Sequence, residues 1–292
     1  MPETKSPRNG AGSEEIIETV RRVLKVLLNI VVYGFCFSYL YPFIWLLINS
    51  FKDRAQFAVD TFNFPTKATL YAYNVIFSKP EVYRAAFNSI FNTGVSLIFI
   101  VGFSYVIGYF LSRYMFKGRN ILYAFFLLGM VIPGSTLIIP LYILFNRFGL
   151  INTYFTLIFP YITFSLPLSI FLYDSYMRTI SRSIEEAAFV DGATINQIMV
   201  RVMFPICRPI TGTVLIFNFM GLWNEFQLAL ILNSAPPFRT IPVWLTNFQG
   251  MYSSDMPVRI TAMLIGSLPI ILTYLFFREK MMEGMAAGAI KG

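Results

Sequence analysis

Six long apolar stretches constrain this chain more than any other feature of its sequence. A bilayer core of about 30 Å is crossed by about 20 helical residues, and each stretch meets or approaches that length. Their apolar residues run around the whole helix, as in membrane spans, and the alternating segments of membrane-spanning strands do not occur. The sequence therefore predicts an all-α membrane protein with six transmembrane helices, at Val26–Ile48, Ser89–Leu111, Ile121–Phe145, Leu157–Met177, Ile210–Leu232 and Ile260–Phe277.

Composition supports this prediction. Charged residues make up only 13% of the 292 positions and hydrophobic residues 56%. Soluble domains usually carry about 25% charged residues, so the composition argues against a water-soluble globule. The net charge of +8 is explained by membrane topology rather than by binding to nucleic acid. The two predicted tails and the second and fourth loops hold 15 of the Lys and Arg residues, and the remaining loops hold 8.

The charge distribution predicts the orientation. Positive charge marks the cytoplasmic side of a membrane protein, and short loops count most. We therefore expect both termini in the cytoplasm, with a tail at 1–25, a six-helix transmembrane domain at 26–277 and a second tail at 278–292. The loop at 181–208, between the fourth and fifth helices, is expected on the same side. The first outer loop is long and basic, but long segments cross largely regardless of their charge.

Prolines interrupt several of these stretches. Each removes a backbone donor and kinks its helix, which a membrane tolerates where a neighbour or a cavity satisfies the freed carbonyl. We expect kinks that serve packing rather than a translocation path at the five positions concerned, Pro42, Pro133, Pro140, Pro160 and Pro167.

The residue inventory excludes several kinds of chemistry. The chain has no histidine, which rules out a histidine-based metal site or proton relay. Cys36 and Cys207 lie far apart in the sequence, without a disulfide framework or metal-ligand spacing. The phosphate-cradling pattern Gly-x-x-x-x-Gly-Lys-Ser/Thr does not occur. We expect no catalytic residue, no metal and no cofactor on this chain.

The loop at 181–208 carries strong local signals for a first short helix. Ser183 is followed three residues later by Glu186, the pattern of a capping box, which predicts a helix beginning at Ile184. Asp191 and Gly192 end that helix, because glycine accepts the left-handed conformation at a helix terminus.

A second short helix follows in the same loop. Thr194 and Gln197 form another capping box, and Pro205 is expected to stop the helix. One apolar stripe with helical spacing runs along it, at Ile195, Ile198, Met199, Val202 and Met203. The loop is thus predicted to be a rigid pair of amphipathic helices joined at a glycine.

At this point the residues resemble a known family. One pattern is similar to the signature of ABC-importer permeases: Glu186-Ala187-Ala188, three residues, Gly192, nine residues and then Val202 to Pro205. The fuller form from Glu186 to Ala193 resembles the carbohydrate branch of that family. Trp223-Asn224-Glu225-Phe226 and the terminal 284–292 resemble its second, maltose-type permease subunit. The departures are Val202 for Ile and Phe204 for Leu, both conservative in an apolar stripe.

The resemblance implies that the loop docks into a groove of a cytoplasmic ATPase subunit. The acidic residues would pair with arginines of that partner, the alanines would allow close approach, and Gly192 would permit the sharp turn. In the alternative interpretation, Glu186 is only a helix cap and the alanines pack the loop on its own bundle. The candidate docking residues are Glu185, Glu186, Ala187, Ala188, Asp191, Gly192 and Ala193.

The resemblance also implies the partners. They are a homologous second permease, two ATPase subunits that hold the ATP and Mg, an extracytoplasmic solute-binding protein and membrane lipid. This chain would then be a transport subunit of the bacterial cytoplasmic membrane and not an enzyme. Its tail, with Gly288 and Lys291, would insert between the two ATPase subunits, although a frayed end is the ordinary expectation.

Two acidic residues lie within the predicted spans, where an ionisable side chain is a functional candidate by default. Asp174 is near the cytoplasmic end of its stretch and can reach interfacial water, which favours a structural role. Glu225 lies deeper, beside Trp223 and Asn224. It either lines the translocation cavity or hydrogen-bonds to a neighbouring helix and so fixes the pairing of subunits. Asn218, seven residues earlier, modestly favours a polar inward stripe. These four residues, Asn218 and 223–225, are the candidates for lining the pathway.

The leading hypothesis is thus a permease subunit of an ATP-driven, binding-protein-dependent importer for a sugar, in the form of an oligosaccharide. An ABC permease for a non-sugar solute is one alternative. An ion-coupled secondary transporter is another, but such transporters usually show paired intramembrane carboxylates or broken helices in matching halves. An integral-membrane enzyme has little support without histidine, clustered acids or a reactive cysteine.

Overall fold

The computed structural model describes residues 10–250 and 255–289, and within these ranges the chain is helical with no strand. Most of the helices are α-helices, η1 and η3 are 3-10 turns, and η2 is a π-helical stretch. In chain order they are α1 (Gly10–Ser50), α2 (Arg54–Val59), α3 (Tyr71–Phe77), α4 (Pro80–Arg113), α5 (Arg119–Val131), η1 (Gly134–Leu137), α6 (Ile138–Arg147), α7 (Ile158–Met177), α8 (Ser183–Val190), α9 (Ile195–Gln197), η2 (Ile198–Met203), α10 (Phe204–Ile206), α11 (Arg208–Trp223), α12 (Gln227–Leu232), η3 (Pro236–Phe238), α13 (Ile241–Leu245), α14 (Asn247–Gly250) and α15 (Met256–Ala289).

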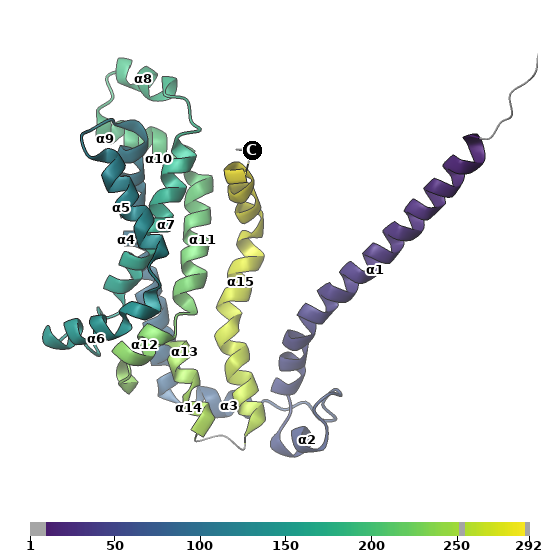
Figure 1. Cartoon of the computed structure of the whole chain (residues 1–292). Coiled ribbons are helices and arrows are strands. Elements are labelled where there is room, and N and C mark those ends of the chain that lie inside the picture. The colour runs from purple at the N-terminus through teal and green to yellow at the C-terminus, as the bar shows by residue number, and fades with distance from the viewer. Residues whose placement is uncertain (1–9, 251–254, 290–292) are drawn as a thin grey trace, which may run out of the picture.

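A bundle of α4, α5, α7, α11 and α15 forms the body of the molecule (Figure 1). Its core is made of apolar and aromatic side chains, including Ile100 and Tyr105 of α4, Tyr173 of α7 and Val214 of α11. Helices α4 and α7 approach most closely at Gly108, where an added Cβ would lie 2.7 Å from the Cβ of Tyr173. Small residues at such crossings let membrane helices pack backbone against backbone.

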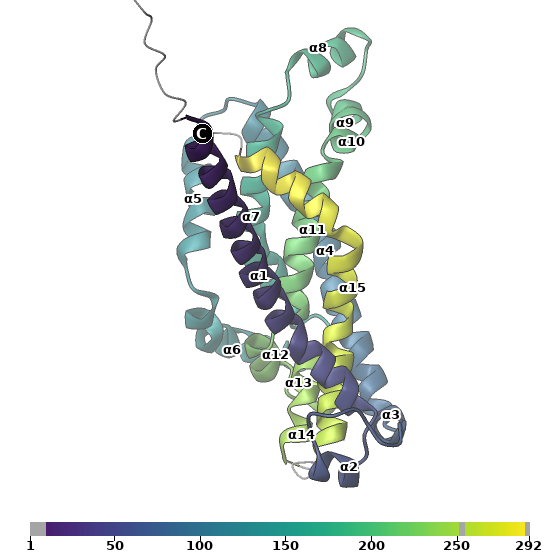
Figure 2. The ribbon, with the colours of Figure 1, turned by 90° about the vertical axis from the view of Figure 1, so that its right-hand side faces the viewer.

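The two ends of the bundle differ. The loop that contains α8 projects from one end, and α2, α3, α13 and α14 gather at the other (Figures 1 and 2). A second apolar core lies at this other end, where Ile76 of α3, Trp244 of α13 and Val258 of α15 are all buried. The chain thus has a main core along the bundle and a second core at the end opposite α8.

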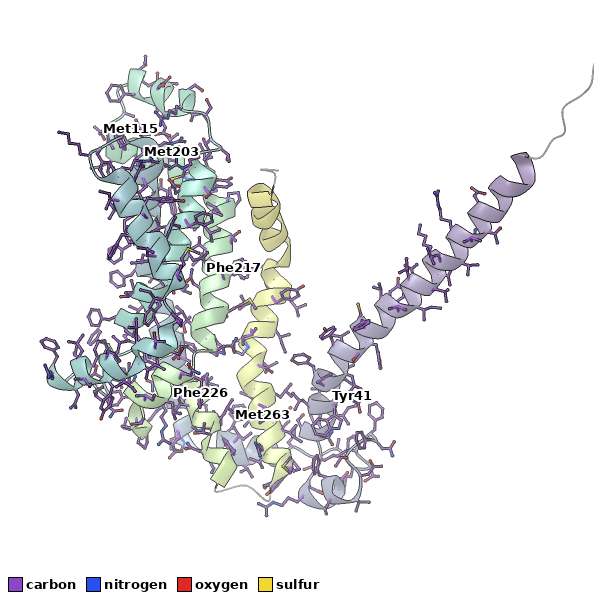
Figure 3. All side chains as sticks on the ribbon, in the orientation of Figure 1. Tyr41, Met115, Met203, Phe217, Phe226 and Met263 are labelled. Atoms are coloured by element: carbon purple, nitrogen blue, oxygen red, sulfur yellow. The ribbon has the colours of Figure 1, made fainter. Side chains whose placement is uncertain are left out.

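Helix α1 stands apart from the bundle. Its 18-residue apolar window is 0% buried, and only its last turns approach α15 (Figures 1 and 3). The side chains of Asn49 and Ser50 at its end are buried. A helix that is apolar on all sides is normally covered by protein or lipid. The described part of this chain leaves the apolar surface of α1 uncovered.

Long single helices confirm three of the predicted stretches. Within the described ranges, three helices are long and apolar enough to cross a membrane, at Glu18–Ser50, Pro80–Arg113 and Met256–Phe277. Two bent pairs would bring the number to five. Helix α7, with 20 residues, matches the fourth stretch but mixes serine, tyrosine and proline among its apolar residues, and it is not in this count. Regular helix extends into both predicted tails, from Gly10 and to Ala289.

The predicted helix at 121–145 is not continuous, and the kink expected at Pro133 is a complete break. Helix α5 ends at Val131, η1 and α6 follow, and the two parts are bent by 89°. Ile132 precedes a proline and is extended, with ψ of 115°. The ring of Pro133 disfavours helical geometry at the residue before it, and proline offers no N–H to continue the helix. Helix α6 therefore projects sideways from the bundle (Figure 1).

The prediction of one helix at 210–232 is also wrong. Helix α11 ends at Trp223, α12 begins at Gln227, and the break contains Asn224, Glu225 and Phe226. No proline causes this break. The side chain of Glu225 stabilises it by accepting two backbone N–H groups at the start of α12, which have no partner within the helix.

Candidate functional site

The loop between α7 and α11 extends beyond the end of the bundle (Figures 1 and 2). Helix α8 ends where the sequence predicts. The N–H groups of Asp191 and Gly192 donate to the carbonyls of Ala187 and Phe189, both at 3.0 Å. Gly192 has a φ of +82°, in the left-handed region that favours glycine. The predicted glycine turn is therefore confirmed.

The start of α8 differs from the prediction. Helix α8 begins at Ser183 with Arg182 in the cap position, and no side chain caps it. The hydroxyl of Ser183 pairs instead with that of Ser181 at 2.8 Å, and the N–H of Glu186 donates to the carbonyl of Arg182. The helix starts one residue early because Arg182 already has helical backbone angles. The expected capping box between Ser183 and Glu186 is thus wrong.

The second capping box is confirmed. Gln197 donates its N–H to the hydroxyl of Thr194, and the Gln197 side chain accepts the Thr194 N–H at 2.8 Å. The helix then widens into the π-helical η2 and ends at Ile206, one residue beyond the expected stop. Pro205 is tolerated because it falls in the first turn of α10, where its missing N–H needs no partner.

The loop exposes apolar side chains that the sequence reasoning did not single out. Phe189 is 66% exposed and Val190 86% exposed, at the C-terminal end of α8. Ala187 is exposed beside them, whereas Ala188 and Ala193 pack against the main core. The sequence signal that could have identified Phe189 and Val190 is their position among the three residues between Ala188 and Gly192. The loop therefore presents an apolar surface on one side and is anchored on the other.

The three acidic candidates of this loop do not act together. The carboxylate of Glu185 turns inward, where Arg113 Nε lies 2.5 Å from Oε1 and the Tyr109 hydroxyl donates to Oε2 at 2.9 Å. Both partners belong to α4. Glu186 and Asp191 are exposed, and neither forms an ion pair within the described ranges. Arg113 and Tyr109 were missed because they lie more than 70 positions earlier in the sequence.

Asp174 has a structural role, but not for the reason expected. Its side chain is 2% exposed and does not face water. It accepts two hydrogen bonds from the guanidinium of Arg178, at 2.8 and 2.9 Å, one turn later on the same segment. The ion pair explains how this carboxylate can be buried.

Cys207 lies at the junction of α10 and α11, where the chain bends by 74°. Its side chain is fully buried. Burial disfavours the charged thiolate and raises the pKa of the thiol to about 12. Cys207 is therefore a packing residue and not a nucleophile.

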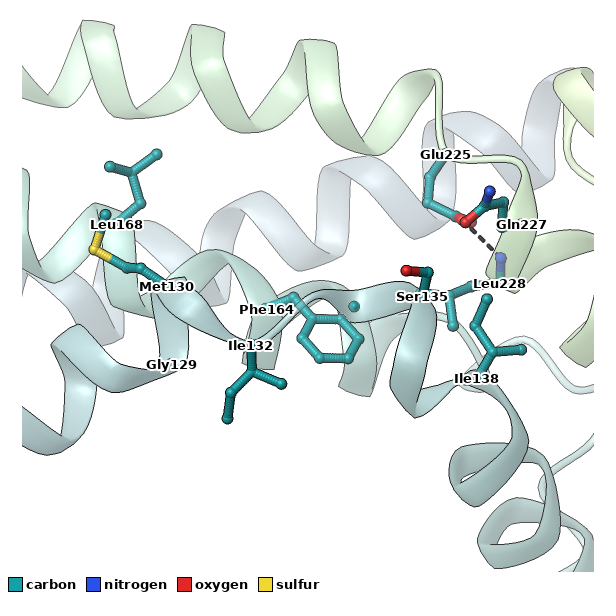
Figure 4. A pocket seen from close by; sticks show the side chains of 11 residues that line it. Gly129, Met130, Ile132, Ser135, Ile138, Phe164, Leu168, Glu225, Gln227 and Leu228 are labelled. Atoms are coloured by element: carbon teal, nitrogen blue, oxygen red, sulfur yellow. Dashed lines mark hydrogen bonds between the residues drawn. The ribbon is translucent and has the colours of Figure 1, made fainter.

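Glu225 lies in the break between α11 and α12. Its carboxylate accepts the N–H group of Leu228 at 2.7 Å (Figure 4). It also accepts the N–H group of Ala229 at 3.0 Å and the hydroxyl of Tyr161 on α7 at 3.2 Å. Glu225 thus bonds to a neighbouring helix of its own chain and also lines a cavity within that chain.

The other pathway candidates are used in packing. Asn218 donates from α11 to the hydroxyl of Ser169 on α7 at 2.9 Å. Trp223 is buried and donates to the carbonyl of Gly266 on α15 at 3.2 Å. Asn224 is exposed and donates to a carbonyl of its own helix. The cavity at Glu225 is not lined by any of these three.

The cavity has a volume of about 400 Å³ and lies where the two broken helices meet α7 (Figure 4). Its polar side chains are those of Ser135, Glu225 and Gln227, and Phe164 contributes an aromatic ring. Ser135 and Gln227 were not among the candidates because each stretch was predicted as one helix, with only a kink at Pro133. Its complete lining is Gly129, Met130, Ile132, Gly134, Ser135, Ile138, Phe164, Leu168, Glu225, Gln227 and Leu228.

Of the two candidates in the C-terminal tail, only Gly288 lies within the described residues. Gly288 lies in the last turns of α15, which continues to Ala289. Lys291 lies outside the described residues.

Comparison with known proteins gives consistent relatives. A putative ABC transporter permease protein of Caldicellulosiruptor sp. is 35% identical over 86% of this chain and 91% of its own length. The sulfoquinovosyl glycerol transport system permease protein of Agrobacterium fabrum is 33% identical over 87% of this chain and 89% of its own. The trehalose/maltose transport system permease protein of Thermococcus litoralis is 31% identical over 94% and 99%.

The fold is also found among solved structures. A chain in the crystal structure of a bacterial ABC transporter involved in the import of the acidic polysaccharide alginate matches with a TM-score of 0.76 and 22% identity, over 95% of this chain and 99% of that chain. Another is from a bacterial alginate ABC transporter in complex with an alginate pentasaccharide-bound periplasmic protein, with a TM-score of 0.65 and 17% identity, over 90% and 94%. Residues 100–279 match the family described as "binding-protein-dependent transport system inner membrane component". The loop with α8, the broken helices and the cavity lie within that match, and the chain belongs to this family of transport permeases.

Proposed function

We propose that this chain is one of two permease subunits in an ATP-driven importer that moves a sugar across the bacterial cytoplasmic membrane. The observation that carries the proposal is α8, which holds the exposed Phe189 and Val190 beyond the end of the bundle on the fixed turn at Gly192. With no nucleotide-binding loop in this sequence, ATP and Mg belong to two partner ATPase subunits. The exposed α8 surface, with Glu186 and Asp191, is the docking face.

The topology in this proposal has six spans and both termini in the cytoplasm. Helices α1, α4, α7 and α15, the bent pair α5–α6 and the interrupted helix α11–α12 are the spans in this proposal. The basic loops and the described parts of the two tails, 10–25 and 278–289, lie on the side of α8, as expected for the cytoplasmic side. The opposite end, with α2, α3, α13 and α14, then faces an extracytoplasmic solute-binding protein. The C-terminal tail, with Gly288 and Lys291, is available to the ATPase pair.

The exposure of helix α1 supports the proposal of a second permease subunit. It is apolar all round and leaves the bundle of its own chain. A homologous permease subunit that packs between α1 and the bundle would bury the helix and complete a gated pathway. Access would then alternate between the two sides of the membrane as the two subunits rearrange.

A sugar is the cargo that fits the cavity and the relatives best. Carboxylate, amide and hydroxyl groups next to an aromatic ring are the groups that bind a polyhydroxylated ring, and the cavity supplies them through Glu225, Gln227, Ser135 and Phe164. The relatives from Agrobacterium fabrum and Thermococcus litoralis carry names of sulfoquinovosyl glycerol and trehalose/maltose transport. An oligosaccharide is the proposed form of the cargo. Ion-coupled transport has no feature here to favour it, because the deep carboxylate of Glu225 already caps a helix.

The experiment is reconstitution of the chain with its second permease, ATPase pair and binding protein in vesicles. We expect ATP-dependent uptake of labelled oligosaccharide, and loss of uptake in Gly192→Trp while the chain still inserts and α4 and α15 remain protected from proteolysis. Uptake that follows an ion gradient without any ATPase subunit would overturn the proposal.

A further inference from the structure

Helix α4 is bound at both ends to segments that lie at opposite ends of the molecule. It is continuous over 34 residues, from Pro80 to Arg113. At about 1.5 Å per residue it is about 50 Å long, which exceeds the membrane core. The other helices that carry the α8 loop, α7 and α11, are shorter, and α11 is bounded by a break at one end and a bend at the other.

At the end near α8, three α4 side chains bind the loop. Arg113 and Tyr109 hold the two oxygens of Glu185, at 2.5 and 2.9 Å. Arg113 also donates twice to the carbonyl of Ile180 at 3.2 Å, and Tyr105 donates to the carbonyl of Met199. The side chains of Arg113 and Glu185 are 5% and 14% exposed.

At the opposite end, two buried α4 side chains bind the segment between α12 and α13. The amide of Asn88 donates to the carbonyls of Pro237 at 2.9 Å and Arg239 at 3.0 Å. The hydroxyl of Ser89 accepts the N–H of Ile241 at 2.8 Å. Asn88 is 2% exposed and Ser89 3% exposed.

Separating the buried pair of Glu185 and Arg113 would leave an unpaired charge away from water, which is strongly unfavourable. Helix α8 and the adjoining end of α4 must therefore move together. The close packing of Gly108 against α7 prevents α4 from bending at this end. A displacement imposed on α8 is thus passed to a straight helix whose far end binds the outer segment.

We propose that Glu185, Arg113 and Tyr109 form an internal anchor through which movement of the α8 loop enters the membrane along α4 and reaches the segment at 233–241. This inference rests on the proposed function. Arg113 and Tyr109 are positioning residues in it, and Glu185 acts within its own chain while Glu186 faces the ATPase. The contacts at both ends are the physical basis, and energetic coupling between the ends is what has to be measured.

The test uses the full complex with its binding protein in vesicles. Three quantities are measured for each variant: copurification of the ATPase subunits, basal ATP hydrolysis, and sugar transported per ATP hydrolysed. In Arg113→Gln and the milder Tyr109→Phe we expect normal copurification and basal hydrolysis. Transport per ATP should fall at least tenfold in Arg113→Gln and less in Tyr109→Phe. Glu186→Gln is the matched control in the same helical turn, and it should weaken copurification instead.

The pairing itself is tested by combining Arg113→Gln with Glu185→Gln. Residues that act through one contact are not additive, so the double variant should transport no less per ATP than Arg113→Gln alone. Losses that multiply would overturn the anchor, as would a normal transport ratio in both Arg113→Gln and Tyr109→Phe. A wild-type complex that recruits no ATPase at all would instead refute the proposed function, so the two failures are distinguishable.

The far end of α4 has its own pair of variants. Asn88→Ala removes the bonds to the outer segment, whereas Asn92→Ala removes a bond made only within α4. We expect stimulation of hydrolysis by the loaded binding protein to fall at least threefold in Asn88→Ala and to persist in Asn92→Ala. Equal stimulation in the two variants would show that the signal does not travel along α4.

Discussion

The contact between α4 and α7 at Gly108 gives the sharpest test of the packing. A Cβ added there would lie 2.7 Å from the Cβ of Tyr173 and 3.3 Å from the backbone nitrogen of Asp174. Carbon atoms in contact are about 3.5–4.0 Å apart, so Gly108→Ala must push the two helices apart by about 1 Å. Neither neighbouring atom is the end of a flexible side chain that could move away. Overpacking of this kind costs about 1–3 kcal/mol.

Alanine also has the higher helix propensity, which contributes about 1 kcal/mol in favour of the variant. Gly102→Ala, six positions earlier on α4, isolates this term because nothing lies within 4 Å of its added Cβ. The difference in unfolding free energy between the two variants should therefore be about 1–3 kcal/mol, with Gly108→Ala the less stable. The assay is thermal or denaturant unfolding of the purified complex in detergent, in which the loss of contact between α4 and α7 is monitored. Equal shifts in the two variants would show that the helices do not meet at Gly108.

Three further predictions concern the loop and the cavity. Gly192→Ala should lose at least half of ATP-driven uptake, because the left-handed backbone costs alanine about 1–2 kcal/mol and no atom lies within 4 Å of an added Cβ. Gly192→Asn should lose less, because asparagine tolerates that backbone better. Equal uptake in both variants would contradict a conformational role. Glu225→Ala leaves two backbone donors unpaired, each costing about 1–3 kcal/mol. It should therefore lower the unfolding temperature more than Glu225→Gln, which keeps one acceptor. The reverse order would exclude a capping role. Because burial raises the pKa of Cys207 to about 12, a water-soluble maleimide at pH 8 should modify it at least tenfold more slowly in the folded complex than after denaturation, as measured by mass spectrometry, and equal rates would place the thiol in water.

The sequence predicts features of this fold that depend on neighbouring residues alone. Apolar runs of membrane length locate α1, α4 and α15. The left-handed turn at Gly192 and the capping box of Thr194 and Gln197 are likewise decided within a few positions. The cap at Ser183 fails although it is local, because the pattern fits two adjacent starting points and Arg182 takes the helical conformation first.

Other features depend on partners far away in the sequence and escape such reasoning. The break at Glu225 contains no proline, and it is stabilised by a carboxylate that binds the start of α12 and Tyr161, 64 positions away. The break at Pro133 had a visible local cause, but hydropathy reads the residues on both sides as one apolar run. Glu185 was grouped with Glu186 because both are acidic and adjacent. Only the position of α4 separates the inward carboxylate from the outward one.

The polar groups of the membrane region bear on where cargo selectivity lies. Asn218 and Trp223 are engaged between helices, and Asp174 is held by Arg178. The polar side chains that line the described cavity are therefore few, and one of them, Glu225, already accepts three hydrogen bonds. An oligosaccharide carries more hydroxyl groups than Ser135 and Gln227 can pair, and a buried polar group without a partner is costly. The proposed second permease must then supply further partners for the cargo, so that exchanging that subunit should alter selectivity more than substitution of Gln227.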